Sequence, residues 1–348
     1  MLQYKNKQSE NRRIVVSDSI YDVTIVGGGP VGMFASFYAG MHELKTQLIE
    51  SLPQLGGQIT ALYPEKQIWD VAGKPGVLGQ ELITDLKKQM SIVKVDQKLG
   101  TKVTNVVKDA DDWFTITTTQ GISRSKTVVI ALGNGAFTPR KLALNGVDEL
   151  SVGKVNYFVK HKDDYANQRV AVLGGGNSAM DMALMLESVA DKVYLIHRRE
   201  EFRGLALTRS QLQASTVQLM TPYLPRTIEE QDNGSITMNL KKMRSDSEAT
   251  LNVDKVLVNY GFTSNNAALT DWQLDLATDR HQIKVDSKMQ TNIPGVYAIG
   301  DDNIYPGKTP LIATGFGEAP IAITDLAKKL YPDKRMATHS SSMHFDSK

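Results

Sequence analysis

Two glycine-rich loops, each between a β-branched run and a helix-like segment, constrain this chain more than any other feature. The first copy reads Val-Thr-Ile-Val-Gly-Gly-Gly-Pro-Val-Gly over residues 23–32, and the second reads Val-Ala-Val-Leu-Gly-Gly-Gly-Asn-Ser-Ala over residues 170–179. A loop of this kind presents backbone N–H groups to a pyrophosphate at a helix N-terminus. One copy alone would be a weak signal, because an ordinary turn is the alternative. Two copies in the same context predict two dinucleotide-binding units.

The residues expected to surround each pyrophosphate occupy matching places in the two loops. The tight turn and the close approach of the backbone require small residues at these places. The positions are Gly27, Gly29 and Gly32 in the first loop, and Gly174, Gly176, Asn177, Ser178 and Ala179 in the second.

The residue expected to read the adenosine ribose differs between the two copies. At the same distance from the first glycine, the first copy has Glu50 and the second has His197, which opens the run His197-Arg198-Arg199. An acid suits a ribose with free hydroxyls, whereas fixed guanidinium donors suit a 2′-phosphate. The cluster, together with Arg203, therefore predicts NADPH rather than NADH in the second unit. A surface glutamate and a solvated basic turn are the alternatives for these positions.

Composition excludes several classes of protein. The chain has no cysteine, which excludes disulfides, thiolate metal sites and cysteine-linked iron–sulfur clusters. No His-x-x-x-His pair lies on a periodic segment, so no metal site is expected. A net charge of +2 does not argue for nucleic acid, and no apolar run reaches the roughly 18–20 residues of a membrane span. The polar N-terminus lacks a signal-peptide core, which predicts a cytoplasmic protein without membrane contact.

The order of apolar runs and breakers predicts an α/β protein with two Rossmann-like, three-layer nucleotide-binding domains. A polar N-terminal extension over residues 1–20 precedes the first strand. Segments 134–140 and 261–265 are rich in turn-forming residues, which marks them as crossings between the domains. The second domain is therefore expected to be inserted into the first. Residues 21–137 and 263–348 should form the first domain, and residues 138–262 the second.

Hydrophobic periodicity also predicts individual elements around the two loops. The expected helices cover residues 33–40, 81–97, 178–190 and 311–330. The expected strands cover residues 46–50, 103–107, 113–118, 126–132, 217–220, 235–240 and 255–259.

Several motifs resemble the thioredoxin reductase family over residues 21–330. The motifs are Gly56-Gly57-Gln58, the run Ile-Ala-Leu-Gly at 130–133, the second glycine loop, His197-Arg198-Arg199 with Phe202-Arg203, and residues 295–301. The resemblance implies that the first domain binds FAD and the inserted domain binds NADPH. The Cys-x-x-Cys of that family has no counterpart here, since the corresponding residues 154–159 contain no cysteine. Electrons would therefore leave from the flavin itself.

The remaining pattern resembles the thioredoxin reductase-like ferredoxin–NADP⁺ reductases. The matching segments are residues 63–66, Trp69-Asp70, Asn156-Tyr157, residues 315–319 and the tail 339–342. This resemblance implies a homodimer, tightly bound FAD, hydride transfer from NADPH and reversible single-electron exchange with ferredoxin or flavodoxin. An acidic partner of this kind predicts a local basic surface. Its candidates are Arg140-Lys141, Lys160-His161-Lys162 and Lys241-Lys242, each of which has ordinary solvated side chains as the alternative.

The same resemblance assigns roles around the flavin. Glu50 would bind the FAD ribose, Gln58 and Tyr63 would lie along the flavin, and Val103 would contact the adenine through its backbone. The further assignments are Phe137 in the crossing segment, Asp301 at the ribityl–pyrophosphate part, and Ser341 (or its neighbours Ser340 and Ser342) at the flavin edge.

A sharper hypothesis places one aromatic ring on each face of the flavin, with Tyr63 on one face and His339 on the other. A half-buried turn tyrosine and a disordered polar tail are the respective alternatives. No catalytic acid or base is expected, because the cofactor carries the chemistry of hydride transfer.

Two other functions remain open from the sequence. One is a flavoprotein reductase of another acceptor, such as a quinone, oxygen or an external disulfide. The other is a non-catalytic redox-sensing flavoprotein that changes partners with the state of its cofactors.

Overall fold

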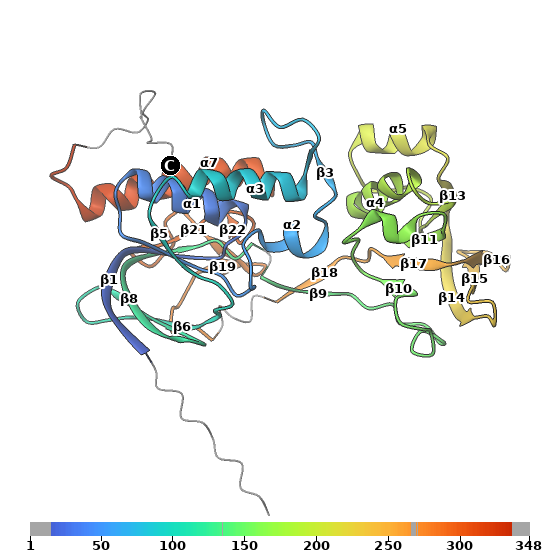
Figure 1. Ribbon diagram of the computed structural model, residues 1–348, viewed down its shortest axis with the longest axis horizontal. Coiled ribbons are helices and arrows are strands. Elements are labelled where there is room, and N and C mark those ends of the chain that lie inside the picture. The colour runs from blue at the N-terminus through green and yellow to red at the C-terminus, as the bar shows by residue number, and fades with distance from the viewer. Residues whose placement is uncertain (1–14, 134, 266–268, 270, 336–348) are drawn as a thin grey trace, which may run out of the picture. The chain divides into compact units, whose positions relative to one another are not determined.

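The computed structural model describes residues 15–133, 135–265, 269 and 271–335, which form two compact units (Figure 1). Unit 1 contains the described residues of 1–57, 85–135 and 266–348, and unit 2 contains residues 58–84 and 136–265. The second unit is thus inserted into the sequence of the first. The expected α/β class with two Rossmann-like nucleotide-binding folds is confirmed.

Unit 1 consists of a mixed sheet, a small second sheet and packed helices. The strands are β1 (Val15–Val26), β2 (Thr46–Ile49), β5 (Val95–Lys98), β6 (Val103–Lys108), β7 (Phe114–Thr118), β8 (Gly121–Ile130), β19 (Thr278–Asp279), β20 (Gln282–Lys284), β21 (Val296–Ala298) and β22 (Asn303–Ile304). The helices are α1 (Pro30–Met41), α7 (Ile312–Leu330) and the second half of α3 (Gly79–Met90). The seven-stranded sheet has the order β5-β2-β1-β8-β7-β6, and β21 also pairs with β8.

Parallel pairing brings the carboxyl ends of four strands of unit 1 to the same edge. β2, β1, β8 and β21 run parallel, with Val26 paired to both Ile49 and Ile130. The β-branched runs of these strands are buried, and Val23 and Ile25 have no exposed surface. A parallel sheet is covered on both faces, which is why such strands are continuously apolar. Helices α1 and α7 pack against each other along this sheet (Figure 1).

Unit 2 is built on a five-stranded parallel sheet with the order β10-β17-β11-β12-β13. These strands are β10 (Val155–Asn156), β17 (Lys255–Val258), β11 (Arg169–Leu173), β12 (Lys192–Ile196) and β13 (Gln218–Met220). The other elements within residues 136–265 are β9 (Ala136–Pro139), η1 (Lys162–Tyr165), α4 (Asn177–Glu187), α5 (Ala206–Ala214), β14 (Tyr223–Glu230), β15 (Ile236–Lys242), β16 (Glu248–Val253) and β18 (Phe262–Asn265).

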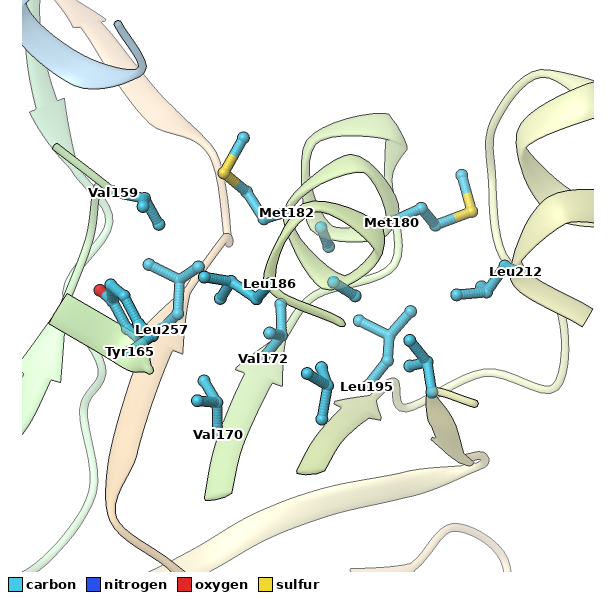
Figure 2. Close-up of a cluster of buried hydrophobic side chains, with 14 residues drawn as sticks. Val159, Tyr165, Val170, Val172, Met180, Met182, Leu186, Leu195, Leu212 and Leu257 are labelled. Atoms are coloured by element: carbon cyan, nitrogen blue, oxygen red, sulfur yellow. The ribbon is translucent and has the colours of Figure 1, made fainter. Parts of the chain in front are cut away.

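The sheet of unit 2 has a hydrophobic core on each face. On one face, Val172 of β11 and Leu195 of β12 lie beneath Leu186 of α4 (Figure 2). On the other face, the antiparallel sheet β14-β15-β16 covers β11 and β17 and contributes Met238 and Leu240, both of them buried. The expected strands 217–220, 235–240 and 255–259 correspond to β13, β15 and β17.

Residues 58–84 form part of unit 2, although the sequence pattern predicted them in the first domain. The segment holds most of α2 (Gly57–Leu62) and the hairpin of β3 (Gln67–Ile68) and β4 (Val77–Leu78). Lys66 Nζ lies 2.7 Å from Asp181 Oδ2 on α4, and the backbone N–H of Lys162 donates to Glu65 Oε2 at 2.8 Å. These contacts between residues distant in sequence tie the segment to unit 2.

Two further expectations about elements differ from the structure. The helix expected over 81–97 ends at Met90, and residues 95–98 form β5, where Val95 pairs with Thr46. Residues 15–20, which were expected to belong to an N-terminal extension, are part of β1, and Val15 pairs there with Gly121 of β8. Among the described residues, no helix is both long and apolar enough to cross a membrane.

Candidate functional site

The first glycine loop follows β1 and is pressed against the end of β8. Gly27 has a φ of +114°, and a Cβ at this residue would lie 2.2 Å from the Ala131 carbonyl oxygen. A Cβ at Gly32 would lie 1.9 Å from the carbonyl oxygen of Gly27. Any side chain at either position would therefore overlap backbone atoms, which explains why both must be glycine.

The N-terminus of α1 is suited to an anion. Its N-cap residue, Gly29, offers no side-chain cap, and Pro30 occupies the first helical position. The N–H groups of the first helical turn lack partners within a helix, and a phosphate is a common partner for them. A Cβ at Gly29 would meet no atom within 4 Å, so the backbone is open on this side. The loop therefore fits the pyrophosphate of a dinucleotide.

Glu50 holds this loop in place from the end of β2. Its side chain is buried, Oε2 accepts from the Gly28 N–H at 2.7 Å, and Oε1 accepts from the Leu52 N–H at 2.7 Å. Ser51 Oγ donates to Oε1 at 3.1 Å. A carboxylate offers about four acceptor sites, so one remains for a ribose hydroxyl.

A third loop, residues 300–302 after β21, lies beside the start of α1. A Cβ at Gly300 would lie 3.6 Å from Val31. Asp301, which the sequence analysis assigned to the ribityl–pyrophosphate part, is half-buried, and burial raises the pKa of its carboxyl group. The neighbouring Asp302 is fully buried, and its Oδ2 accepts from the Leu132 N–H at 2.7 Å. Burial holds the pKa of Asp302 well above its usual range.

The second glycine loop repeats this architecture between β11 and α4. Gly174 has a φ of +154°, and a Cβ there would lie 2.6 Å from the Asn259 carbonyl oxygen and 2.8 Å from the Ala179 Cβ. The N-cap residue of α4, Gly176, likewise offers no side-chain cap. Asn177 Oδ1 accepts from the Leu205 N–H at 3.1 Å, which ties the following loop to the glycine loop.

His197 is a buried residue whose pKa is lowered, which disfavours its charged form. A Cβ at Gly175 would lie 2.2 Å from its imidazole ring, and the ring centroid lies 5.5 Å from that of Phe202. Burial lowers the pKa of His197 below 6.5, and the charges of Arg199, Arg203 and Arg198 lower it further. The imidazole thus gives the loop its shape, and positive charge comes from the arginines.

The three arginines are free to meet a phosphate. Arg198, Arg199 and Arg203 are exposed, and none of their guanidinium groups forms an ion pair with a residue that the structure describes. The backbone N–H of Arg203 donates to the Gly175 carbonyl oxygen at 2.8 Å, which fixes this segment beside the glycine loop.

Within residues 15–133, 135–265, 269 and 271–335, no group of acidic or histidine side chains could hold a metal ion.

The other residues named from the sequence are found in several places. Val103 is buried at the start of β6, two residues after Thr101, whose N–H donates to the Glu50 carbonyl oxygen at 2.9 Å. Gln58 lies in the first turn of α2, and Tyr63 follows α2 and packs against the hydrophobic cluster of unit 2. Phe137 lies on β9, with its backbone opposite Ser264. His339 and Ser341 lie outside the described residues.

Three residues near the third loop had no predicted role, although one of them, Glu318, lies in the family-like segment 315–319. Asp302, Lys308 and Glu318 are all buried, and Lys308 and Glu318 form an ion pair. Glu318 is the one charged residue among the small and apolar residues 312–323, and this signal could have drawn attention to the group.

The protonation of His197 can be tested directly. The imidazole should titrate below 6.5 in NMR spectra of histidine-labelled protein, with the signal assigned by its loss in H197Q. The folded protein binds this proton more weakly than the unfolded chain does. The contribution of His197 to the free energy of unfolding is therefore fully present above pH 6.5. That contribution is lost as the pH falls through the lower, folded value. A pKa raised above 6.5 would contradict this prediction and favour a positively charged His197 in the site.

Comparisons with known proteins agree with this geometry. The model of a family described as pyridine nucleotide-disulphide oxidoreductase matches residues 21–324. A protein of Limosilactobacillus fermentum named ferredoxin–NADP reductase is 66% identical, over 93% of this chain and 98% of its own length. A protein of Latilactobacillus sakei subsp. sakei named ferredoxin–NADP reductase 2 is 48% identical, again over 93% of this chain and 98% of its own length.

Solved structures show the same fold. The thioredoxin reductase of Lactococcus lactis is 26% identical with a TM-score of 0.76, and the match covers 90% of this chain and 99% of that protein. The thioredoxin reductase of T. acidophilum has the same TM-score of 0.76 at 23% identity, with 89% of this chain and 99% of that protein covered. The second similarity concerns the fold alone.

Proposed function

We propose that this NADPH-dependent flavoprotein reductase, which belongs to the pyridine nucleotide-disulphide oxidoreductase family, delivers single electrons to ferredoxin or flavodoxin. The observation that carries the proposal is the combination of two dinucleotide loops with a chain that has no cysteine. FAD supplies hydride acceptance from NADPH and the release of electrons one at a time. A dithiol relay within these 348 residues is excluded, so electrons would leave directly for an external acceptor.

The acceptor is proposed from the names of the relatives. The proteins that are 66% and 48% identical to this chain are named ferredoxin–NADP reductases. Ferredoxins and flavodoxins are acidic, so the exposed cations Lys141, Lys160 and Lys162 are candidates for their docking. Electron exchange in both directions is part of the proposal.

The proposed binding residues follow the two glycine loops. In unit 1, the uncapped start of α1 would bind the pyrophosphate of FAD, and Glu50 and Asp301 would bind its sugar parts. The full set for FAD is Gly27, Gly29, Gly32, Glu50, Gln58, Tyr63, Val103, Phe137, Asp301 and Ser341, with Tyr63 and His339 proposed to stack on the flavin. The full set for NADPH is Gly174, Gly176, Asn177, Ser178, His197, Arg198, Arg199 and Arg203.

A homodimer and a cytoplasmic location complete the proposal. Half-buried aromatic side chains on α1 and α7 give unit 1 an apolar surface that suits association, with Phe34 lying 5.3 Å from Phe316 between ring centroids. The cytoplasm is proposed because it supplies both NADPH and the small electron carriers. Light scattering after gel filtration would measure the oligomeric state.

An acceptor assay tests the function. NADPH should support ferredoxin reduction about 100-fold more efficiently than NADH, because two or more charge-assisted hydrogen bonds to the 2′-phosphate are lost with NADH. The measurement compares kcat/KM for ferredoxin, flavodoxin, a quinone and an external disulfide, with both nucleotides.

Other outcomes point to the other functions. Ferredoxin reduction no faster than the quinone background would indicate a reductase of a different acceptor. Tight FAD binding without NADPH oxidation in any of these assays would indicate a redox-sensing protein instead.

A further inference from the structure

A single buried carboxylate in α7 gathers four hydrogen-bond donors of unit 1. Glu318 Oε2 accepts from the Gly300 N–H at 2.7 Å and from Asn303 Nδ2 at 3.1 Å. Its Oε1 accepts from the Tyr305 hydroxyl at 2.8 Å and from Lys308 Nζ. The side chains of Glu318 and Lys308 are 2% and 4% exposed, respectively, so the ion pair has almost no contact with water.

Lys308 and Glu318 together hold both sides of one residue of the main chain. Glu318 accepts from the Gly300 N–H, and Lys308 Nζ donates to the Gly300 carbonyl oxygen at 2.8 Å. Gly300 has a φ of +85° and is followed directly by Asp301. Two charged side chains therefore set the direction in which the chain continues from Gly300 to Asp301. Glu318 reaches Gly300 from α7, and Lys308 reaches it from the loop before α7.

The turn fixed in this way abuts the start of α1. A Cβ at Gly315, in the first turn of α7, would lie 2.4 Å from Val31 and 3.4 Å from the Gly300 Cα. The first turns of α1 and α7 and the Gly300 turn therefore meet at one point, which is the place where the pyrophosphate is expected. Gln282 supports the turn from β20, since its Nε2 donates to the Asp301 carbonyl oxygen at 3.1 Å.

A buried ion pair usually adds little to the stability of a fold. The desolvation of both charges commonly cancels their attraction, and apolar residues of similar volume stabilise at least as well. The role of the pair here is to fix the orientation of the Gly300 turn. Charge-assisted hydrogen bonds hold the Gly300 peptide groups more tightly than apolar contacts could. Burial and the Glu318 carboxylate raise the pKa of Tyr305 to about 12, so its hydroxyl stays a donor to the same carboxylate.

We propose that Glu318 and Lys308 are positioning residues for FAD, which hold the Gly300–Asp301 turn in its cofactor-binding orientation without touching the cofactor themselves. The inference rests on the proposed role of Asp301 in FAD binding. It assigns a function to two residues whose chemistry is otherwise unused by the reductase.

The test measures FAD affinity rather than activity. E318Q and K308M should each raise the dissociation constant of FAD from the apoprotein about tenfold, because each loses a charge-assisted hydrogen bond to the turn. Their flavin should also show altered visible circular dichroism. The double variant should have about the same FAD affinity as the single variant that binds FAD less tightly, since both residues act on the same main-chain residue.

A second ion pair of unit 1 serves as the matched control. Lys126 Nζ lies 2.8 Å from Asp22 Oδ1. Among the described residues, neither side chain forms a hydrogen bond with the Gly300 turn. D22N and K126M should lower the thermal midpoint but leave FAD affinity and the flavin spectrum unchanged. If E318Q fails to fold, Q282A takes its place, because Gln282 is only partly buried and holds Asp301 from the other side.

The outcomes separate this inference from the proposed function. If the wild-type apoprotein binds FAD and E318Q, K308M and Q282A bind it equally well, the positioning role is wrong while the function stands. If D22N weakens FAD binding as much as E318Q, the pair acts only through stability, and the inference is again overturned. If the wild-type protein binds no FAD, the proposed function and this inference both fail.

Discussion

Replacing Gly27 by alanine should yield a folded protein that purifies without FAD. The φ of +114° and a Cβ only 2.2 Å from the Ala131 carbonyl oxygen would force the loop away from the end of β8. The backbone strain costs about 1–3 kcal/mol and the overpacking a further ~1–3 kcal/mol, so FAD affinity should fall at least about 30-fold. The ratio of flavin to protein absorbance and a titration of the apoprotein with FAD would measure the effect.

Gly317 supplies the control for this substitution. It is exposed on α7, and a Cβ there would meet no atom within 4 Å. G317A should retain wild-type FAD content and gain about 0.5–1 kcal/mol of helix stability. Wild-type FAD content in G27A would mean that the first glycine loop is not the FAD site.

Replacing Arg198 and Arg199 together by alanine should remove the preference for NADPH. Both guanidinium groups are exposed and have no ion-pair partner among the described residues, so a 2′-phosphate would be their main ligand. Each charge-assisted hydrogen bond lost costs about 1.5–3 kcal/mol, so the dissociation constant of NADPH should rise about 100-fold or more. The dissociation constant of NADH should hardly change, because NADH has no phosphate at that position. Isothermal titration with both nucleotides would measure the two constants.

Arg226 is the matched control for the arginine pair. It lies on β14 of the same unit and is exposed. R226A should therefore leave both dissociation constants unchanged. Equal weakening of NADPH and NADH in R198A/R199A would argue that the arginines support the fold of the loop, and that the preference for NADPH arises elsewhere.

The local parts of the site follow from the sequence, because their constraints act over short stretches of chain. Gly27 and Gly174 come directly after buried strands, and each requires a φ that only glycine adopts readily. Glu50 directly follows β2, at the distance from the loop at which the sequence predicts a ribose-binding acid, and its carboxylate also accepts from the Gly28 N–H. Both glycine loops, their helices and the acid could therefore be located before the structure was known.

Other features depend on contacts that no local pattern contains. The expected helix over 81–97 is cut short because Val95 pairs with Thr46, and helical periodicity alone cannot reveal that pairing. The neutral state of His197 arises from its burial against Gly175, whereas its neighbours in sequence suggested a cation. Lys308 and Glu318 meet only because a loop and α7 converge on Gly300, so neither could be assigned a role from its sequence context.

The membership of residues 58–84 in unit 2 has a consequence for dissecting the protein. The polypeptide passes between the two units four times, so unit 2 is not one uninterrupted stretch of sequence. A fragment covering only residues 136–265 would leave Asp181 without Lys66 and would uncover the cluster against which Tyr63 packs. Gene fusions and domain exchange that use unit 2 would therefore have to carry the earlier segment along with the inserted one.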